Sequence, residues 1–179
     1  MSNWNIDPDH SVAAFAIRHM MISNVRGQFN SITGTINFDP ANPGSATVKA
    51  VIAVSSLATG IRKRDEHLLS PDFFEVEKYP EIHFRSTGVE ATGGNKGRVR
   101  GDLTIHGVTR PVVLEVEYSG PVKGPEAMGG ETSIGFAAAI KINREDFGMG
   151  WNVPLDNNGL MVGNEVSITV DVEADLAGA

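Results

Sequence analysis

Apolar and polar residues alternate along most of the chain. In the stretch that begins at Ala46, apolar side chains at 48, 50, 52 and 54 fall on one face, opposite Thr47, Lys49 and Ser55. A period of two is typical of a β-strand with one buried face. The same alternation recurs at 15–19, 99–105, 112–118, 134–142 and 166–172. One apolar face per strand predicts a single shared interior.

The apolar positions change parity between Val25 and Phe38. Phe29 falls on an odd position, whereas Ile32, Ile36 and Phe38 fall on even ones. A slip of one residue would turn half of such a strand to the wrong face. We therefore expect a bulge or bend near residues 30–33, of the kind that curves a sheet into a barrel.

Turn-forming residues separate the predicted strands, most clearly at 39–44, 92–95 and 106–107. About eight strands then follow one another, with one helical interruption between Ser55 and Tyr79. In that insertion Ile61, Leu68 and Leu69 line one side of a helix, and Ser70 caps a second short turn. The pattern predicts an all-β fold: a single eight-stranded antiparallel β-barrel, with a short helical insertion across one end.

Composition narrows the function classes. The 179 residues fit one domain, 1–179, and no apolar run reaches the roughly 20 residues of a membrane span. A net charge of −7 argues against nucleic acid or an anionic membrane surface as partner. The chain has no cysteine, which excludes disulfides and zinc–thiolate sites. No export signal precedes Trp4, so we expect a cytoplasmic protein, or a periplasmic one if a longer natural chain was trimmed.

Catalytic and cofactor motifs are missing from the sequence. The five histidines form no HExxH and no i,i+4 pair, and GxSxG, GxGxxG and GxxxxGK[ST] do not occur. We expect no catalytic residue, no metal and no cofactor, and interpret the histidines as structural. Folding could still gather His19, His67 and His106. His19 shares the parity of Phe15 and Ile17, so it is expected to offer a polar contact inside the barrel.

Several short motifs occur together in one order along the chain. They are IDPDHS at 6–11, FAIRH at 15–19, VRGQF at 25–29, RDEHL at 64–68, FF at 73–74, YPEIHF at 79–84, GDLTIHGVTR at 101–110 and INREDFG at 142–148. Together they resemble the YceI-like family, from Trp4 to about Ala174. The resemblance implies a lipocalin-like barrel that holds a long apolar lipid such as a polyisoprenoid. The resemblance also implies a polar lattice that joins the predicted helix, the turn at 101–110 and the corner at 143–148, formed by Arg64, Asp65, Asp102, Arg144 and Asp146. A catalytic carboxylate pair is the alternative.

The predicted interior mixes large and small residues. Phe15, Phe84 and Phe136 alternate with small residues at 50, 101, 135, 137, 138 and 139, which suits either a tapered solid core or a cavity. The resemblance favours the cavity. For ligand binding we predict residues of the inward parity and two residues of a Gly-rich loop that could act as a lid: Phe15, Ile17, His19, Phe29, Ile52, Phe84, Leu103, Phe136, Ala138, Ile140, Met149 and Trp151.

The expected ligand is a long apolar or amphipathic lipid, of polyisoprenoid or isoprenoid-quinone type, that the protein carries or sequesters. Each buried CH₂ contributes about 0.8 kcal/mol, so ten carbons outweigh a head-group hydrogen bond worth about 1 kcal/mol. Two alternatives remain open. One is an enzyme acting on such a lipid, with Arg64, Asp65, His67 and His106 at the barrel mouth. The other is an interaction protein with a filled barrel. A homodimer is a further expectation.

Overall fold

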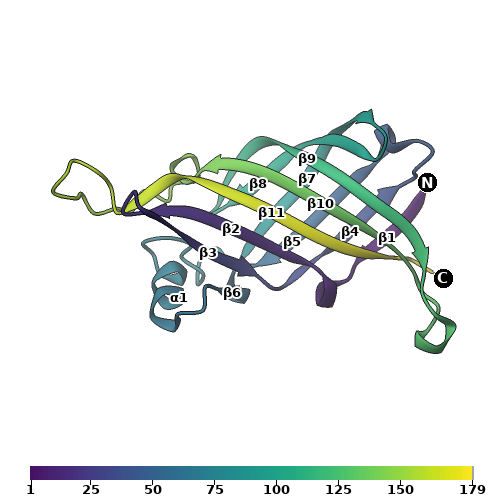
Figure 1. Ribbon diagram of the computed structural model, residues 1–179, viewed down its shortest axis with the longest axis horizontal. Coiled ribbons are helices and arrows are strands. Elements are labelled where there is room, and N and C mark those ends of the chain that lie inside the picture. Colours follow the sequence, from purple (N-terminus) through teal and green to yellow (C-terminus); the bar gives the residue numbers. More distant parts are fainter. Residues whose placement is uncertain (179) are drawn as a thin grey trace.

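The computed structural model describes residues 1–178, which consist mainly of β-strands (Figure 1). The strands are β1 (Ser2–Ile6), β2 (Val12–His19), β3 (Ser23–Phe29), β4 (Ile32–Phe38), β5 (Thr47–Ala53), β6 (Leu57–Ala58), β7 (Glu81–Gly93), β8 (Lys96–Ile105), β9 (Val108–Lys123), β10 (Thr132–Asn143) and β11 (Val162–Leu176). The helices are α1 (Arg62–Leu69) and the short 3₁₀ turns η1 (Pro8–His10), η2 (Pro43–Ser45), η3 (Val54–Ser56), η4 (Glu126–Met128) and η5 (Arg144–Phe147).

Eight strands close into an antiparallel barrel in the order β1-β4-β5-β7-β8-β9-β10-β11, because β1 pairs with both β4 and β11. The remaining strands continue from β11: β2 pairs with it, β3 with β2, and β6 with β3. β1 and β2 therefore lie end to end along β11, so they act as one kinked strand. The predicted eight-stranded barrel is confirmed.

Short irregular segments produce two kinks in the barrel wall. At the first, Ser11 Oγ donates to the Glu173 carbonyl at 3.3 Å and accepts from the Glu173 N–H at 3.2 Å. At the second, Ser56 Oγ accepts from the N–H groups of Asn30 and Ser31, each at 3.1 Å. The break at 30–31 lies where the apolar parity shifts, so the expected bend is present.

The strand faces follow the predicted alternation, with one correction. Ile134 is 1% exposed, and Phe136 and Ile142 on the same face pack against the core. Ala137 and Ala139, expected inside, are exposed on the outer face. Gly135 shares their parity. Strand geometry turns successive side chains to opposite faces, so 137, 138 and 139 cannot all point inward.

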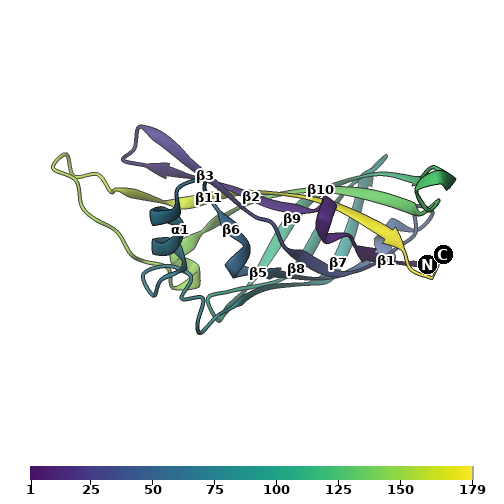
Figure 2. The same ribbon diagram turned by 90° about the horizontal axis from the view of Figure 1, so that it is seen from below.

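Helix α1 and two projecting connections gather at one end of the barrel, and both chain termini lie at the other (Figures 1 and 2). Leu68 and Leu69 pack against the core as expected, but Ile61 is 53% exposed and does not. Ser70 Oγ accepts the N–H of Asp72 at 3.4 Å, in line with the predicted cap. Within residues 1–178, no helix combines the length and apolar character needed to cross a membrane.

Candidate ligand cavity

A cavity of about 410 Å³ occupies the barrel interior. Its size falls within the range of small-molecule binding sites, roughly 300–1,000 Å³. Every strand except β6 contributes lining residues, and nearly all the lining side chains are aliphatic or aromatic. The lining residues include no Asp or Glu. The interior is therefore suited to an apolar ligand.

The structure places all twelve predicted binding residues around this one cavity. Ten lie on the inner faces of the strands or at their ends, and two lie on the connection between β10 and β11: Phe15, Ile17, His19, Phe29, Ile52, Phe84, Leu103, Phe136, Ala138, Ile140, Met149 and Trp151. That they contact a ligand stays a prediction.

The sequence interpretation did not include several other lining residues. Ile6 and Phe38 were missed because they belong to β1 and to the segment beyond the second kink. Phe73 and Phe74 follow α1 and line the cavity at the helical end. The resemblance motif at 73–74 was the available signal for them, since no strand parity applies there.

Two glycines make room for aromatic rings within the wall. A Cβ atom at Gly101 would overlap the Phe84 ring, and one at Gly27 would lie 2.5 Å from Phe15 Cζ. Both rings line the cavity. The glycines therefore let the phenylalanines lie flat against neighbouring strands instead of filling the interior, which helps to keep the space open.

Polar lining residues lie towards the two ends of the barrel. Arg18, Arg64, His67 and Arg144 line the end that α1 covers, whereas Asn95 and Lys96 come from the hairpin turn between β7 and β8. A ligand with an apolar chain and a polar head would thus find polar groups only near an end. Such a distribution suits an amphipathic molecule lying along the barrel axis.

Arg144 is the most buried charged residue at the helical end, at 2% exposure. Its Nε donates to the Gly163 carbonyl at 2.8 Å, and Nη1 donates to the carbonyls of Met149 at 2.6 Å and Trp151 at 2.9 Å. Nη2 donates to Asn164 Oδ1 at 3.3 Å and to the Val162 carbonyl at 3.5 Å. Burial lowers the pKa of the guanidinium. Arg144 thus fastens both ends of the β10–β11 connection.

The predicted polar lattice is wrong. Arg64 and Asp65 both bind Thr59: Arg64 Nε donates to Thr59 Oγ1 at 2.7 Å, and Asp65 Oδ1 accepts the Thr59 N–H at 2.9 Å. Asp102 is exposed, because its position on β8 faces outward. Asp146 takes part through its main chain, whose carbonyl accepts from Arg110 Nε at 2.9 Å. Each group is satisfied locally, so no buried carboxylate pair joins the three motifs.

An aromatic cluster closes the helical end of the cavity. The rings of His67, Phe73 and Trp151 pack together, with centroids 4.8 Å apart for His67–Trp151 and 5.3 Å for Phe73–Trp151. Met149, which looked exposed in the sequence, is only 6% exposed. The first part of the β10–β11 connection is therefore packed against the insertion and does not extend freely into solvent.

Of the three histidines that folding could gather, His19 and His67 line the cavity, but His106 does not. His106 Nε2 lies 3.4 Å from Glu75 Oε2, and its ring packs on Tyr79 with centroids 4.6 Å apart. Neither His106 nor Asp65 lines the cavity. Of the four residues expected to meet at the barrel mouth, only Arg64 and His67 do so.

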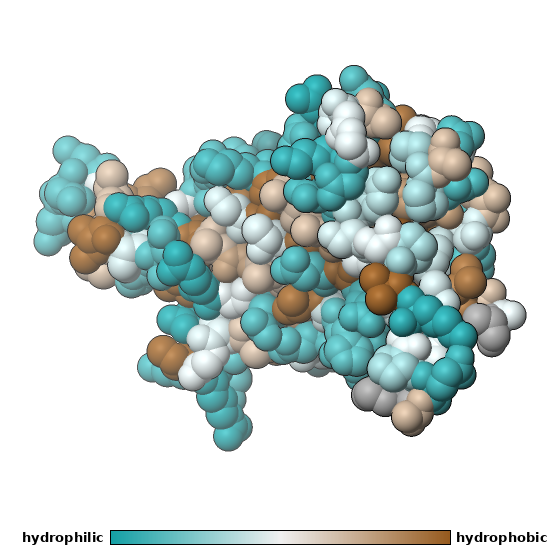
Figure 3. All heavy atoms as spheres, turned by 45° about the vertical axis from the view of Figure 1, so that its right-hand side comes forward, coloured by the Kyte–Doolittle hydropathy of each residue, from teal (hydrophilic) through white to brown (hydrophobic). Residues whose placement is uncertain are grey.

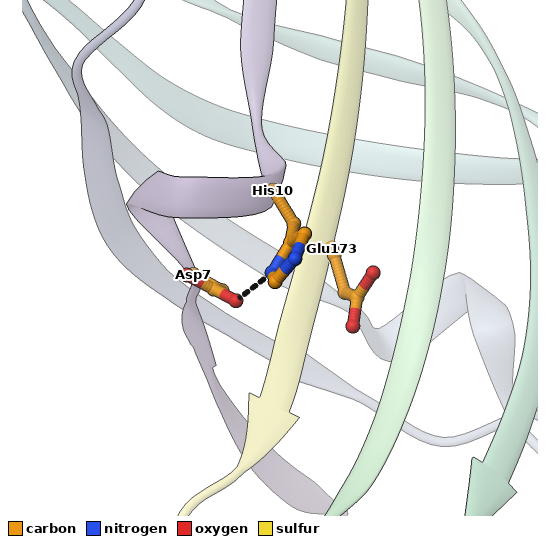
Figure 4. Close-up of side chains that lie close together, drawn as sticks. All are labelled: Asp7, His10 and Glu173. Atoms are coloured by element: carbon orange, nitrogen blue, oxygen red, sulfur yellow. Dashed lines mark hydrogen bonds and ion pairs between the residues drawn. The ribbon is translucent and has the colours of Figure 1, made fainter. Parts of the chain in front are cut away.

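At the surface near the first kink, Asp7, His10 and Glu173 lie close together (Figure 4). His10 Nδ1 lies 2.5 Å from Asp7 Oδ2. This hydrogen bond raises the pKa of His10 and lowers the pKa of Asp7. Asp7 also accepts the Asp9 N–H at 2.9 Å, which begins η1. The ion pair and the cap account for the arrangement of these side chains.

Comparison with known proteins agrees with this architecture. A UPF0312 protein of Photorhabdus laumondii is 42% identical over 148 residues, covering 82% of this chain and 75% of that protein. The crystal structure of a Campylobacter jejuni YceI protein superposes with a TM-score of 0.73 at 33% identity, covering 88% of each chain. A polyisoprenoid binding domain from Saccharophagus degradans has the same fold, with a TM-score of 0.67 at 15% identity over 98% of this chain and 99% of that one.

The family model for the YceI-like domain matches residues 4–174, nearly the whole chain. This match, the one-third identity to a YceI protein of known structure and the closed eight-stranded barrel lead to one conclusion: the chain belongs to the YceI-like family.

Proposed function

We propose that this protein binds a long apolar or amphipathic lipid inside the barrel and carries or sequesters it. The observation that carries the proposal is the cavity of about 410 Å³, whose wall is almost wholly apolar and includes no carboxylate. Each methylene buried there adds about 0.8 kcal/mol. Affinity would therefore come from the chain of the ligand more than from its head.

A polyisoprenoid, or a quinone with an isoprenoid tail, is the ligand class we favour. The polyisoprenoid binding domain from Saccharophagus degradans, which shares the fold, supports this choice. The aromatic rings along the wall fit the same class, since Phe15, Phe29 and Phe74 offer flat surfaces to a branched, unsaturated chain. A long acyl chain is the second ligand class that such an apolar wall suits.

The direct experiment is to extract the purified protein with organic solvent and identify the released molecules by mass spectrometry. We expect a stoichiometric long-chain species, with an isoprenoid repeat in its mass. Protein that still yields no lipid on extraction after incubation with excess long-chain lipid would contradict the proposal. Conversion of the added lipid into another compound would instead indicate an enzyme.

A matched pair of samples makes the result quantitative. Delipidated protein that is incubated with a long-chain polyprenol should hold one lipid per chain more than delipidated protein incubated without it. The melting temperature should be higher in the lipid-loaded sample, because a ligand that binds only the folded state stabilises that state. An unchanged melting temperature in a sample that retains lipid would place that lipid outside the cavity.

A further inference from the structure

Five exposed apolar side chains lie on the two segments that project at the helical end of the barrel. Met20, Met21 and Ile22 form the turn between β2 and β3 and are 40%, 57% and 77% exposed. Val153 and Leu160, on the β10–β11 connection, are 37% and 42% exposed. We call these five residues the apolar tip. In Figures 1 and 2 the two segments project beyond the barrel, and Figure 3 shows brown surface among the teal on that side.

The backbone of the β2–β3 turn is poorly suited to the residues it contains. Met20 and Met21 have φ angles of 49° and 64°, and the Ile22 N–H donates to the His19 carbonyl at 3.1 Å. Two consecutive residues in the left-handed region make a type I′ turn, which favours Asn–Gly and disfavours long side chains. Two exposed methionines at these positions are unfavourable both for the backbone and for solvation, so the turn is not optimised for the folded state in water alone.

The hairpin that carries this turn has two arginines and no carboxylate, and the one carboxylate between Val153 and Leu160 on the other segment is Asp156. Arg18 Nη2 donates to the Met21 carbonyl at 3.1 Å, and Arg26 is exposed on β3. No Asp or Glu occurs between Asp9 and Asp39. The hairpin is therefore a local basic and apolar element in a chain whose net charge is −7. Its charge is complementary to anionic phospholipid, which the overall composition would repel.

The apolar tip adjoins the cavity. The Met20 N–H donates to the Met161 carbonyl at 2.7 Å, and a Cβ atom at Gly159 would overlap Met21 Sδ, so the two projecting segments touch. Arg18 and Met161 also line the cavity. The helical end of the cavity therefore lies beside both Arg18 and the apolar tip.

We propose that the apolar tip inserts into the interfacial region of an anionic phospholipid bilayer, with Arg18 and Arg26 at the level of the phosphates. Amphipathic surfaces with basic flanks bind such interfaces through apolar burial and attraction to anionic lipid together. The helical end of the cavity then faces the membrane. This inference rests on the proposed function for its purpose, since docking would serve lipid uptake or delivery.

The test is sedimentation of the full chain with vesicles of phosphatidylcholine alone or of equal parts phosphatidylcholine and phosphatidylglycerol. We expect binding to the anionic vesicles, weakened by salt at about 0.5 M. The double variant Met20→Asn/Met21→Gly supplies residues that the turn prefers, so it should fold and lose at least about tenfold in partitioning. Ile22→Ser should act in the same direction without changing the two left-handed positions.

Val122→Thr is the matched control, because Val122 is 67% exposed but lies on β9 at the opposite end. It should bind vesicles like the unmodified protein. Equal binding by the double variant would overturn the proposal, as would binding that is indifferent to phosphatidylglycerol. The proposal would also be overturned if the unmodified protein were a dimer that does not bind vesicles and the double variant were a monomer. The apolar tip would then serve self-association.

Lipid extraction from the same samples separates the two proposals. Protein that holds lipid but ignores vesicles would leave the carrier function standing and remove the docking surface. Protein that binds anionic vesicles through the apolar tip but never holds lipid would leave the docking surface standing and remove the carrier function.

Discussion

At the scale of single residues, Arg144 explains why the helical end of the barrel has a fixed shape. All five of its N–H donors have oxygen acceptors, and four of these acceptors are main-chain carbonyls. A buried charge without a carboxylate partner is costly unless such hydrogen bonds replace its water. Those carbonyls belong to the two ends of the β10–β11 connection, so the guanidinium sets the path of that segment.

We predict that Arg144→Ala lowers the free energy of unfolding by about 3 kcal/mol or more, since several buried carbonyls lose their donor. Arg144→Lys should recover little, because one ammonium group cannot reach carbonyls on both sides as a planar guanidinium does. Urea denaturation followed by circular dichroism measures both.

Asp102→Ala is the control for this prediction. Asp102 is exposed, so its replacement should change stability by no more than about 0.5 kcal/mol. If Arg144→Ala unfolds at the same urea concentration as the unmodified protein, the role given to Arg144 is wrong.

The pKa of His10 should lie above the ordinary histidine value of 6.5, because the Asp7 carboxylate stabilises the imidazolium. A raised folded pKa contributes stability below about pH 6.5, and this contribution is lost as the pH rises through that pKa. The lowered pKa of Asp7 contributes stability above the ordinary aspartate pKa of 3.8, and this contribution is lost as the pH falls through the folded pKa. The Asp7–His10 pair therefore stabilises the folded state most at pH values between about 3.8 and 6.5.

Asp7→Asn tests the cause, because asparagine keeps an oxygen for the Asp9 N–H but has no charge. In a proton NMR titration the His10 midpoint should fall in this variant, because the largest cause of the raised pKa is removed, while the charges of Glu173 and Asp9 remain. A midpoint that stays where it was would show that Asp7 is not responsible.

At the scale of elements, Trp151 joins the β10–β11 connection to the α1 insertion across the cavity end. We predict that a long-chain lipid shifts its fluorescence to the blue and reduces quenching by iodide, because ligand would exclude water from the ring. Trp4 is 3% exposed, and its Nε1 donates to the Phe38 carbonyl, so its emission should stay constant.

The Trp151→Phe variant is the control and leaves the core tryptophan untouched. The lipid-dependent change should vanish in this variant while lipid still binds. A change that survives in Trp151→Phe, or the lack of any change in the unmodified protein, would mean that this connection is only a packed barrel end.

The sequence predicted the strands well, because the two-residue alternation of a β-strand is visible within a short stretch of residues. Alternation located the strands and their inner faces, and the shift of parity located the bend at 30–31. The error at Gly135, Ala137 and Ala139 came from treating small size as inward direction, although parity already assigned them outside. Sequence periodicity was therefore the better guide to the cavity wall.

The connections could not be predicted in the same way. Met149 is buried because Arg144 holds its carbonyl, and no local pattern shows a contact of that kind. The lattice failed because motifs that occur together need not touch: Thr59, an unremarkable residue in the sequence, is the true partner of Arg64 and Asp65. The sequence analysis did not single out the methionines at 20 and 21, because their exposure and their positive φ angles become apparent only in the structure.

At the scale of the whole molecule, the barrel is closed by hydrogen bonds, yet its interior is not filled. Small residues at the wall and rings laid against Gly27 and Gly101 keep a cavity open through the centre. An empty apolar cavity forfeits packing contacts. A bound lipid would restore those contacts, which makes occupancy of the barrel the central claim.

The most direct measurement compares Ala138→Trp with Ala137→Trp, using titration of the neutral fluorescent probe N-phenyl-1-naphthylamine. Ala138 lines the cavity, whereas Ala137 next to it is exposed on the outer face, so the two variants differ in the side of the wall that receives the ring. We predict that Ala138→Trp remains folded and loses probe binding by at least about tenfold, because the indole fills the space. Ala137→Trp should bind as the unmodified protein does. Equal probe affinity in two folded variants would contradict a ligand site inside the barrel.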